Sequence, residues 1–506
     1  MKAIMIQGTS SDAGKSLLCT GLCRLLKNRG YRVAPFKSQN MSLNSYITRD
    51  GAEIGRAQGV QAEACGVEAT SDMNPILLKP KGDRQSEIVL HGKHYRDMDT
   101  YREGRDFVPF AMEQIGAAID RLRAAGYELL VVEGAGSPVE VNLKARDITN
   151  MRVAERLDCP VLLVADIERG GVFAQIVGTL ELLSPEERAR VKGLVINKFR
   201  GDLALFADGV AFLEEKTGVP VLGVIPHLEH EIDPEDSLAL SALRLKPIAQ
   251  DAGGRGWQGE VLHVAVIQYP RLSNFTDAIP LQDEPGVQVR YVTSPAELGQ
   301  PDLILLPGSK NTMQDLLWLE RQGLVDAIRD RYARGSDLVG ICGGFQMLGE
   351  RLFDPCRVES DLPERRGLGL LPVETTFAVE KRTIRNRGHL LLPAFAAQEV
   401  EGYEIHLGRT ERKGAAPFLR FQDGEADGAV SPDGRVFGTY LHGLFQNRSF
   451  TRAFFNQLRV KKGAVPLPPE VLSEGERRER SYQRLAAHLE EHLDVERLLG
   501  LIEEQG

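Results

Sequence analysis

A glycine loop between an apolar run and an amphipathic segment constrains this chain most. Residues 8–16 read GTSSDAGKS and directly follow the apolar run KAIMIQ. A buried strand, a glycine loop ending in Lys15 and Ser16, and then a helix form an arrangement that holds nucleotide phosphates, because backbone N–H groups face the anion. The standard loop has four residues between its first glycine and the Gly-Lys pair, whereas five separate Gly8 from Gly14 here. We predict a nucleotide-binding loop; the alternative is a tight strand–helix turn with an exposed lysine.

A carboxylate for a metal ion is expected at the end of another buried strand. The apolar run LLVV ends in Glu133, so Ser16 and Glu133 are the predicted oxygen ligands of Mg²⁺. Asp12, inside the loop, is a second candidate, although an aspartate in a loop often only accepts backbone hydrogen bonds. Asn197 and Lys198 end a further apolar run, where an adenine base would lie. The alternative for this pair is a turn at the end of a strand.

The first half alternates apolar runs with amphipathic stretches. This pattern predicts a parallel sheet covered by helices on both faces. The expected strands are Lys2–Gln7, Arg32–Phe36, Glu128–Glu133, Pro160–Ala165, Lys192–Asn197 and Pro220–Ile225. The expected helices include Lys15–Arg29, Phe107–Ala125 and Leu203–Thr217.

The chain divides into an N-terminal domain over 1–245, a Gly-rich linker over 246–260, a second α/β domain over 261–455 and a charged helical tail over 456–506. In the second domain the expected strands are Val261–Gln268, Gln288–Thr293, Asp302–Leu306 and Asp337–Ile341. The tail carries Arg, Glu and Leu at helical spacing, which favours a solvated closing helix.

A cysteine stands at a predicted strand-to-helix corner of the second domain. Cys342 lies between glycines in GICGGFQ, so its sulfur would be exposed in a strained turn beside a helix N-terminus that lowers the pKa of the thiol. A distant histidine would serve as its base. His442 in TYLHG is the predicted base, and His406 in YEIH is the competitor. The alternative is a cysteine that only packs in the core.

Composition and charge narrow the classes of protein to which this chain could belong. The chain has 506 residues and a formal charge of −9, without a basic stripe, so nucleic acid is not an expected partner. No run approaches the roughly 18 apolar residues of a membrane span, and the N-terminus resembles a first strand rather than a signal peptide. Six cysteines without a regular framework indicate reduced thiols and a cytoplasmic protein.

Taken together, these motifs resemble the cobyric acid synthase family, the glutamine-dependent amidotransferases of the cobalamin pathway. The motifs that carry the resemblance span most of the chain: QGTSSDAGKS (7–16), PFKSQNMSLNSY (35–46), EGAGSPVEVNL (133–143), ARDITNM (145–151), ADIERGGVFA (165–174), NKFRGD (197–202), LPGSKNT (306–312), GICGGFQMLG (340–349), GYEIHLGRT (402–410) and GTYLHGLF (438–445). The phosphate loop alone also resembles that of dethiobiotin synthetase, which has the same five-residue spacing.

The resemblance implies a dethiobiotin-synthetase-like P-loop ATPase domain with a parallel sheet, fused to a class I glutamine amidotransferase-like α/β domain. Such enzymes use ATP and L-glutamine to amidate the b, d, e and g carboxylates of adenosylcobyrinic acid a,c-diamide. Cys342 would be the nucleophile and His442 its base. Class I glutaminases usually follow this histidine with Pro-Glu, but Gly and Leu stand here, so Glu404 is considered as the third group.

Further residues receive roles from this resemblance. Backbone N–H groups at Gly343 and near Gly308 and Ser309 are expected to stabilise an oxyanion. Polar residues in loops after the predicted strands are expected to position the substrate or the acyl phosphate, with turn and cap roles as the alternative. These are Asn40, Asn44, Asn142, Asp147 and Asn150.

Other functions predict different features. The a,c-diamide synthase, or another amidotransferase with a dethiobiotin-synthetase-like domain, shares this architecture and differs in substrate. A partition-type ATPase would carry a second lysine early in the phosphate loop, where Thr9, Ser10 and Ser11 stand, and it would have no use for Cys342. A scaffold with relic sites would lose nothing on substitution of Cys342.

Overall fold

The chain folds into two compact units. The computed structural model describes residues 1–81, 85–99, 103–233, 257, 259–396, 398–469 and 472–505. Unit 1 contains Met1–Glu235 together with Gly475–Gly506, and unit 2 contains Asp236–Glu474. Of the predicted linker 246–260, residues 246–256 and 258 lie outside the described residues.

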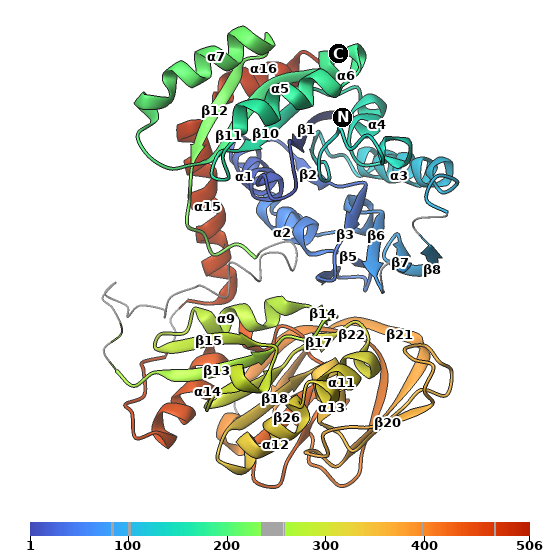
Figure 1. The fold of residues 1–506 in the computed structure, drawn as a ribbon, viewed down its shortest axis with the longest axis vertical. Coiled ribbons are helices and arrows are strands. Elements are labelled where there is room, and N and C mark those ends of the chain that lie inside the picture. Colours follow the sequence, from blue (N-terminus) through green and yellow to red (C-terminus); the bar gives the residue numbers. More distant parts are fainter. Residues whose placement is uncertain are drawn as a thin grey trace. The chain divides into compact units, whose positions relative to one another are not determined.

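Unit 1 is built on a six-stranded parallel sheet (Figure 1). The strand order is β12-β11-β10-β1-β9-β2, and every neighbouring pair is parallel. The strands predicted for the first half are confirmed, with the bounds β1 Lys2–Gly8, β2 Val33–Phe36, β9 Leu129–Glu133, β10 Val161–Asp166, β11 Val191–Phe199 and β12 Val221–Pro226. Because the strands are parallel, the loops that follow them meet at one edge, where open α/β sheets bind ligands.

Helices cover both faces of this sheet, since successive strand residues point to opposite sides. Ile4 and Ile6 of β1 pack in an apolar cluster with α1 and α2, whereas Ala3 and Met5 pack in a second cluster with α3, α4 and α5. The bounds are α1 Lys15–Asn28, α2 Arg56–Cys65, α3 Val108–Ala124, α4 Met151–Leu157, α5 Val172–Leu182, α6 Pro185–Arg190 and α7 Ala207–Thr217.

The segment after β2 forms small sheets that the sequence did not predict. A four-stranded sheet has the order β3-β6-β7-β8, and β4 pairs with β5 in a hairpin. The bounds are β3 Gln39–Met41, β4 Ser45–Ile47, β5 Glu53–Gly55, β6 Ile76–Pro80, β7 Gln85–Leu90 and β8 Lys93–Asp99. β3, β4 and β5 are only three residues long and β8 is mostly polar, so these four lack the apolar runs by which strands are recognised. β6 and β7 carry short apolar runs at 76–78 and 88–90, which the prediction missed.

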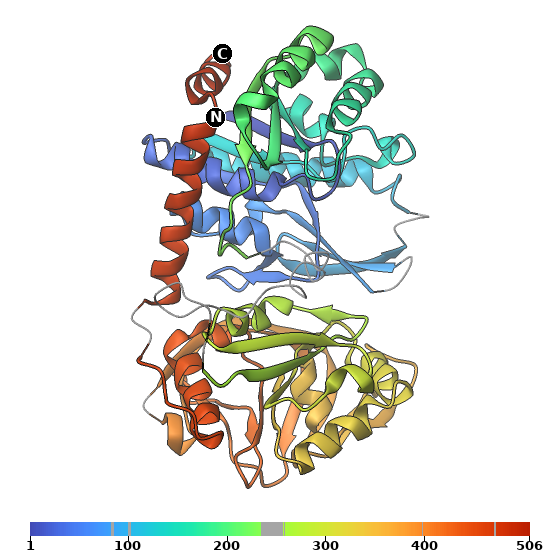
Figure 2. The ribbon, with the colours of Figure 1, turned by 60° about the vertical axis from the view of Figure 1, so that its left-hand side comes forward.

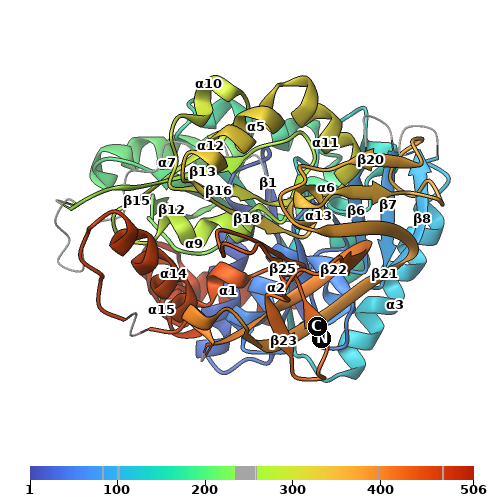
Figure 3. The same ribbon diagram turned by 90° about the horizontal axis from the view of Figure 1, so that it is seen from below.

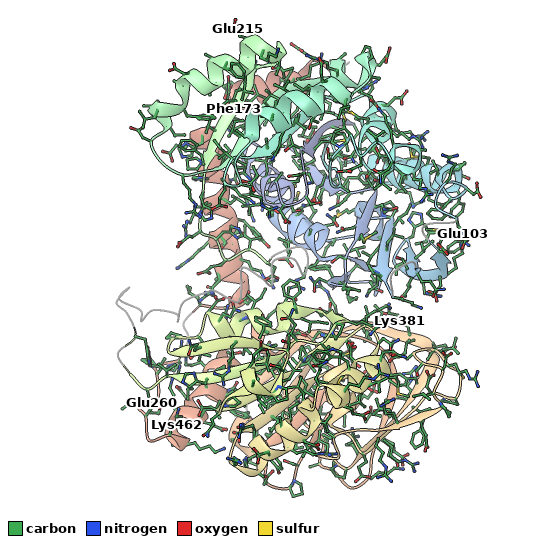
Figure 4. The ribbon with its side chains drawn as sticks, viewed as in Figure 1. Glu103, Phe173, Glu215, Glu260, Lys381 and Lys462 are labelled. Carbon is green, nitrogen blue, oxygen red and sulfur yellow. The ribbon has the colours of Figure 1, made fainter. Side chains whose placement is uncertain are left out.

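Unit 2 contains a second six-stranded sheet, of order β15-β13-β16-β18-β26-β25, parallel except for its β25–β26 edge. The four strands predicted for this half are confirmed. The bounds are β13 Leu262–Ile267, β15 Val287–Val292, β16 Leu303–Leu306, β18 Asp337–Ile341, β25 Ala429–Val430 and β26 Val436–Thr439. Lys462 pairs with Glu260, just before β13, at 2.9 Å (Figure 4).

Two long strands of unit 2 form an antiparallel ribbon outside this sheet (Figure 3). They are β21 Val373–Leu390 and β22 Glu399–Arg412. Helices of unit 2 include α9 Ile279–Gln282, α11 Thr312–Arg321, α12 Leu324–Ala333, α13 Gly343–Leu348 and α14 Arg448–Lys461. None of the described helices in either unit is long and apolar enough to span a membrane.

The C-terminal segment is helical as predicted, but it is not a solvated tail. It forms α15 Glu474–His492 and α16 Val495–Glu503, and its residues from Gly475 onward belong to unit 1 (Figure 2). Tyr482, Leu485 and Leu489 are buried in the same apolar cluster as α1. These few apolar residues recur at helical spacing, so a mostly charged helix still has one face for the core.

Candidate functional site

The phosphate loop joins β1 to α1 in unit 1. Gly14 has a φ of +95°, which favours glycine, and a Cβ there would collide with the side-chain amide of Asn197. Lys15 folds back over the loop, where its Nζ donates to the carbonyls of Ser10 at 2.9 Å and Gly136 at 3.2 Å. A Cβ on Gly8 would lie 2.9 Å from this Nζ, so the lysine lies against the bare backbone of the loop.

Glu133 is fully buried at the end of β9 and lies beside Ser16. Its Oε1 accepts hydrogen bonds from Ser16 Oγ and Lys37 Nζ, both at 2.8 Å, and its Oε2 accepts one from Gln61 Nε2 at 2.6 Å. The adjacent hydroxyl and carboxylate oxygens fit a Mg²⁺ ion, which in proteins is bound by one or two carboxylates plus phosphate oxygens. Sequence reasoning missed Lys37 and Gln61; the position of Lys37 directly after a strand was the available signal.

The other residues predicted to bind the nucleotide form hydrogen bonds or ion pairs that involve the phosphate loop. Asn197 Nδ2 donates to the carbonyl of Ala13 at 2.9 Å. Lys198 Nζ donates to the carbonyl of Asp12 at 2.6 Å and to Asp166 Oδ2 at 2.8 Å. The Asp12 carboxylate pairs with Arg169 at 3.1 Å. These contacts hold the loop, and a role of Asn197 and Lys198 toward adenine stays a prediction.

The five polar residues predicted to position the substrate are spread over two regions of unit 1, and Asn40 lies in strand β3 rather than in a loop. Asn40 donates to Gln58 at 2.9 Å, and Asn44 is buried nearby. Asp147 accepts hydrogen bonds from Thr149 and Asn150, and Asn150 donates to the carbonyl of Ala135 at 2.8 Å. Asn142 is exposed. The bonds of Asp147 and Asn150 are those of a turn and a loop, and substrate contact stays a prediction for all five.

In unit 2, Cys342 occupies a strained elbow between β18 and α13. Its φ of 52° and ψ of −108° are rare for a residue other than glycine. The glycines around it are required, since a Cβ on Gly340 would lie 2.7 Å from the Gly344 backbone and one on Gly344 would collide with the carbonyl of Leu306. The prediction that the Cys342 sulfur is exposed is wrong: Cys342 is 6% exposed, and its sulfur lies 3.6 Å from the Ile405 carbonyl oxygen.

The predicted oxyanion residues come together at this elbow. Gly308 and Ser309 form β17, which pairs with β14 (Leu272–Ser273). A Cβ on Gly343 would lie 2.9 Å from the backbone nitrogen of Ser309, and one on Gly308 would lie 3.0 Å from His442 Cε1. Gly343 therefore lies close to the backbone of Ser309, and Gly308 lies close to the imidazole of His442, while an oxyanion role for these N–H groups stays a prediction.

His442, three residues after the end of β26, is oriented by Asp277. Its Nδ1 lies 2.7 Å from Asp277 Oδ2, and the N–H of Gly443 donates to Asp277 Oδ1 at 2.8 Å. Both side chains are essentially inaccessible to solvent. Burial lowers the pKa of His442, but Asp277 and Cys342 outweigh burial and raise it to about 10. The Asp277 bond engages Nδ1 and leaves Nε2 for proton transfer.

The prediction that Glu404 orients His442 is wrong. The Glu404 carboxylate lies 3.2 Å from His406 Nε2 and 3.1 Å from Arg382 Nε, and the His406 ring stacks on Tyr440 with centroids 3.7 Å apart. Asp277 lies in a short 3-10 helix, Phe275–Ala278, at the carboxyl side of β13. Its position after a strand is a weak signal, because only the fold brings it to His442.

The raised pKa of His442 predicts how Asp277 contributes to stability. A histidine whose pKa rises from 6.5 to about 10 on folding stabilises the fold fully below pH 6.5 and loses that contribution as the pH approaches 10. The Asp277→Asn substitution should therefore lower the melting temperature most near pH 6, and least near pH 10. Melting curves of both proteins across this range check the prediction; a difference that grows with pH would contradict it.

Comparison with known proteins gives the same division of the chain. Residues 263–450 match the family model described as CobB/CobQ-like glutamine amidotransferase domain, and residues 4–236 match the CobQ/CobB/MinD/ParA nucleotide binding domain. The chain is 49% identical over 506 residues to a cobyric acid synthase of Geobacillus kaustophilus, covering 99% of this chain and 98% of that protein. It is 47% identical to the cobyric acid synthase of Streptococcus sanguinis, covering 99% of both.

Proposed function

The chain belongs to the cobyric acid synthase family, and from this membership we propose that it amidates the b, d, e and g carboxylates of adenosylcobyrinic acid a,c-diamide with ATP and L-glutamine. The observation that carries the proposal is the Cys342–His442–Asp277 arrangement in the amidotransferase domain of a chain that also holds a phosphate loop. A thiol beside an oriented imidazole supplies nitrogen, and a phosphate loop supplies activation of the acid that receives it.

Glutamine hydrolysis would begin at Cys342. Its thiolate attacks the side-chain amide carbon of glutamine, and the oxyanion accepts hydrogen bonds from backbone N–H groups of Gly343 and Ser309. His442 gives its proton to the departing nitrogen, so the C–N bond breaks, ammonia leaves and a thioester remains. His442 then takes a proton from water, which attacks the thioester carbonyl carbon; the C–S bond breaks, and glutamate and the Cys342 thiolate are released. Asp277 keeps the imidazole in the orientation that these two transfers need.

Amide synthesis requires activation of a substrate carboxylate, because hydroxide is a poor leaving group. Transfer of the ATP γ-phosphoryl group to a carboxylate oxygen gives an acyl phosphate and ADP. Ammonia attacks its carbonyl carbon, the C–O bond to phosphate breaks, and the amide and phosphate are released. Lys15 neutralises negative charge on the phosphates. Mg²⁺, held by Ser16 and Glu133, would stabilise the charge on the transferred group.

The test of this function is direct. The purified protein is given cobyrinic acid a,c-diamide in its adenosyl form, ATP, Mg²⁺ and glutamine, and the amides are counted by mass spectrometry while ADP is measured. Four added amides are expected. Amidation of cobyrinic acid itself at the a and c positions, with no reaction of the diamide, would favour the a,c-diamide synthase, and no ADP with either corrinoid would contradict the proposal.

Removal of the Asp277 carboxylate should lower the rate of amide synthesis from glutamine and leave the rate from ammonium unchanged. The Asp277→Asn variant should lose about 10²- to 10⁴-fold in glutamine-dependent synthesis, because the amide favours the wrong imidazole tautomer. Synthesis from ammonium chloride should stay near the wild-type rate. The matched control is Glu404→Gln, which changes the carboxylate on His406 and not the one on His442. A larger loss in the control than in Asp277→Asn would show that Asp277 is not the orienting group.

A further inference from the structure

The C-terminal helix α15 lies directly against the helix that follows the phosphate loop (Figure 2). Gly21, in the middle of α1, has no room for a side chain: a Cβ there would collide with Leu489 and lie 3.0 Å from Leu485 Cγ. The two helices therefore meet at van der Waals distance over bare backbone. Such a contact fixes their separation more firmly than long side chains would.

An ion pair between a buried arginine and a half-exposed glutamate adds to this contact. Arg24 on α1 is 1% exposed, and its Nη2 lies 2.6 Å from Glu479 Oε2 on α15. The guanidinium also lies over the Tyr482 ring, 5.6 Å from its centroid. Removal of the carboxylate would leave a buried cation without its counter-ion, which is costly. The position of α1 thus depends on Glu479.

The same face of α15 also contacts α2. Glu63 on α2 accepts a hydrogen bond from the Tyr482 hydroxyl at 3.0 Å and lies 3.3 Å from Arg478 Nη1. Since residues 478, 479 and 482 follow helical spacing, one face of α15 contacts two helices. Gln61, on α2 near Glu63, donates to Glu133, and Ser16 at the start of α1 donates to the same carboxylate.

We propose that Arg478, Glu479 and Tyr482 are positioning residues of the nucleotide site. They hold α1 and α2 at the separation that brings Ser16 and Gln61 to the two oxygens of Glu133. All three follow the amidotransferase domain in the sequence. The inference rests on the proposed ATP-dependent function, and it makes the C-terminal segment part of the ATP site rather than an appendage.

The test measures ATP binding separately from amide synthesis. Calorimetric titration of the full-length protein with ATP and MgCl₂ gives the Kd, and ammonium-dependent synthesis gives KM for ATP and kcat. Glu479→Gln should raise the Kd and the KM for ATP about tenfold, while the KM for ammonium stays unchanged, and Glu479→Asp should recover part of the loss. Tyr482→Phe, which deletes one hydroxyl and keeps the packed ring, should raise the Kd about threefold while the protein stays folded, with only a small fall in the melting temperature.

Glu490→Gln is the matched control. Glu490 lies on the same helix, is as exposed as Glu479 and pairs with Arg29 of α1 at 2.8 Å. Arg29 is 37% exposed whereas Arg24 is buried, so no change in ATP binding is expected from the control. Normal ATP binding in both Glu479→Gln and Tyr482→Phe would overturn the inference. If the Glu479→Gln protein does not fold, the Kd of the Tyr482→Phe protein for ATP tests the inference, and an unchanged Kd would overturn it. Failure of the wild-type protein to bind ATP would instead contradict the proposed function.

Discussion

Replacement of Cys342 with alanine is expected to abolish synthesis from glutamine and to leave synthesis from ammonium chloride near the wild-type rate. The alanine side chain cannot form a thioester, so the glutamine-dependent rate should fall by about 10⁴- to 10⁶-fold, as when a catalytic nucleophile is removed. Added ammonium supplies the same ammonia to the acyl phosphate without this step. The measurement is the rate of ADP release and amide formation with each nitrogen source.

Cys356→Ala is the matched control for this experiment. Cys356 is a free cysteine of the same unit, and it is exposed, whereas Cys342 is buried in the elbow. The control should retain both rates, which separates the loss of one particular thiol from the loss of any thiol. Glutamine-dependent synthesis that survives in Cys342→Ala would mean that nitrogen is released elsewhere, and the mechanism proposed for His442 and Asp277 would fail with it.

Much of the fold could be predicted because the two main sheets bury both faces of their strands. Runs such as 129–132 of β9 and Leu303–Leu306 are continuously apolar for that reason, and the predicted fold class, a nucleotide-binding α/β domain joined to an amidotransferase α/β domain, is confirmed. Short polar strands such as β4 and β5 are stabilised by their neighbours rather than by their own pattern, so the sequence did not predict them.

The residues of the candidate site likewise divide into those that a sequence motif predicts and those that only the fold brings together. Cys342 and Lys15 stand in glycine motifs whose spacing is visible in the sequence, although distant contacts, such as that of Gly344 with Leu306, also require some of these glycines. Asp277 is brought to His442 only by the packing of the fold. Glu404 was predicted as the third group of the Cys342–His442 site, yet its carboxylate lies 3.2 Å from Nε2 of the neighbouring His406. Partners that are distant along the chain leave no local signal.

Substitution of Lys15 with alanine should abolish amide synthesis from both nitrogen sources. The Lys15 ammonium now donates to carbonyls of Ser10, in the phosphate loop, and Gly136, in the loop that follows Glu133. Phosphate oxygens are stronger acceptors than these carbonyls, so bound ATP should recruit the ammonium from them. Loss of such a positioned cation removes stabilisation of the transferred phosphoryl group, and we expect a decrease of at least about 10²-fold.

The Lys15→Ala variant therefore differs from Cys342→Ala in its response to ammonium. Ammonium chloride should rescue Cys342→Ala and fail to rescue Lys15→Ala, because the acyl phosphate is needed whatever the source of nitrogen. Cys342 of the Lys15→Ala protein should still react with an electrophilic glutamine analogue, which shows that unit 2 is folded. Lys27→Ala, an exposed lysine in the last turn of the same helix, is the control with unchanged rates. Wild-type synthesis by Lys15→Ala would mean that the phosphate loop does not bind the ATP that drives amidation.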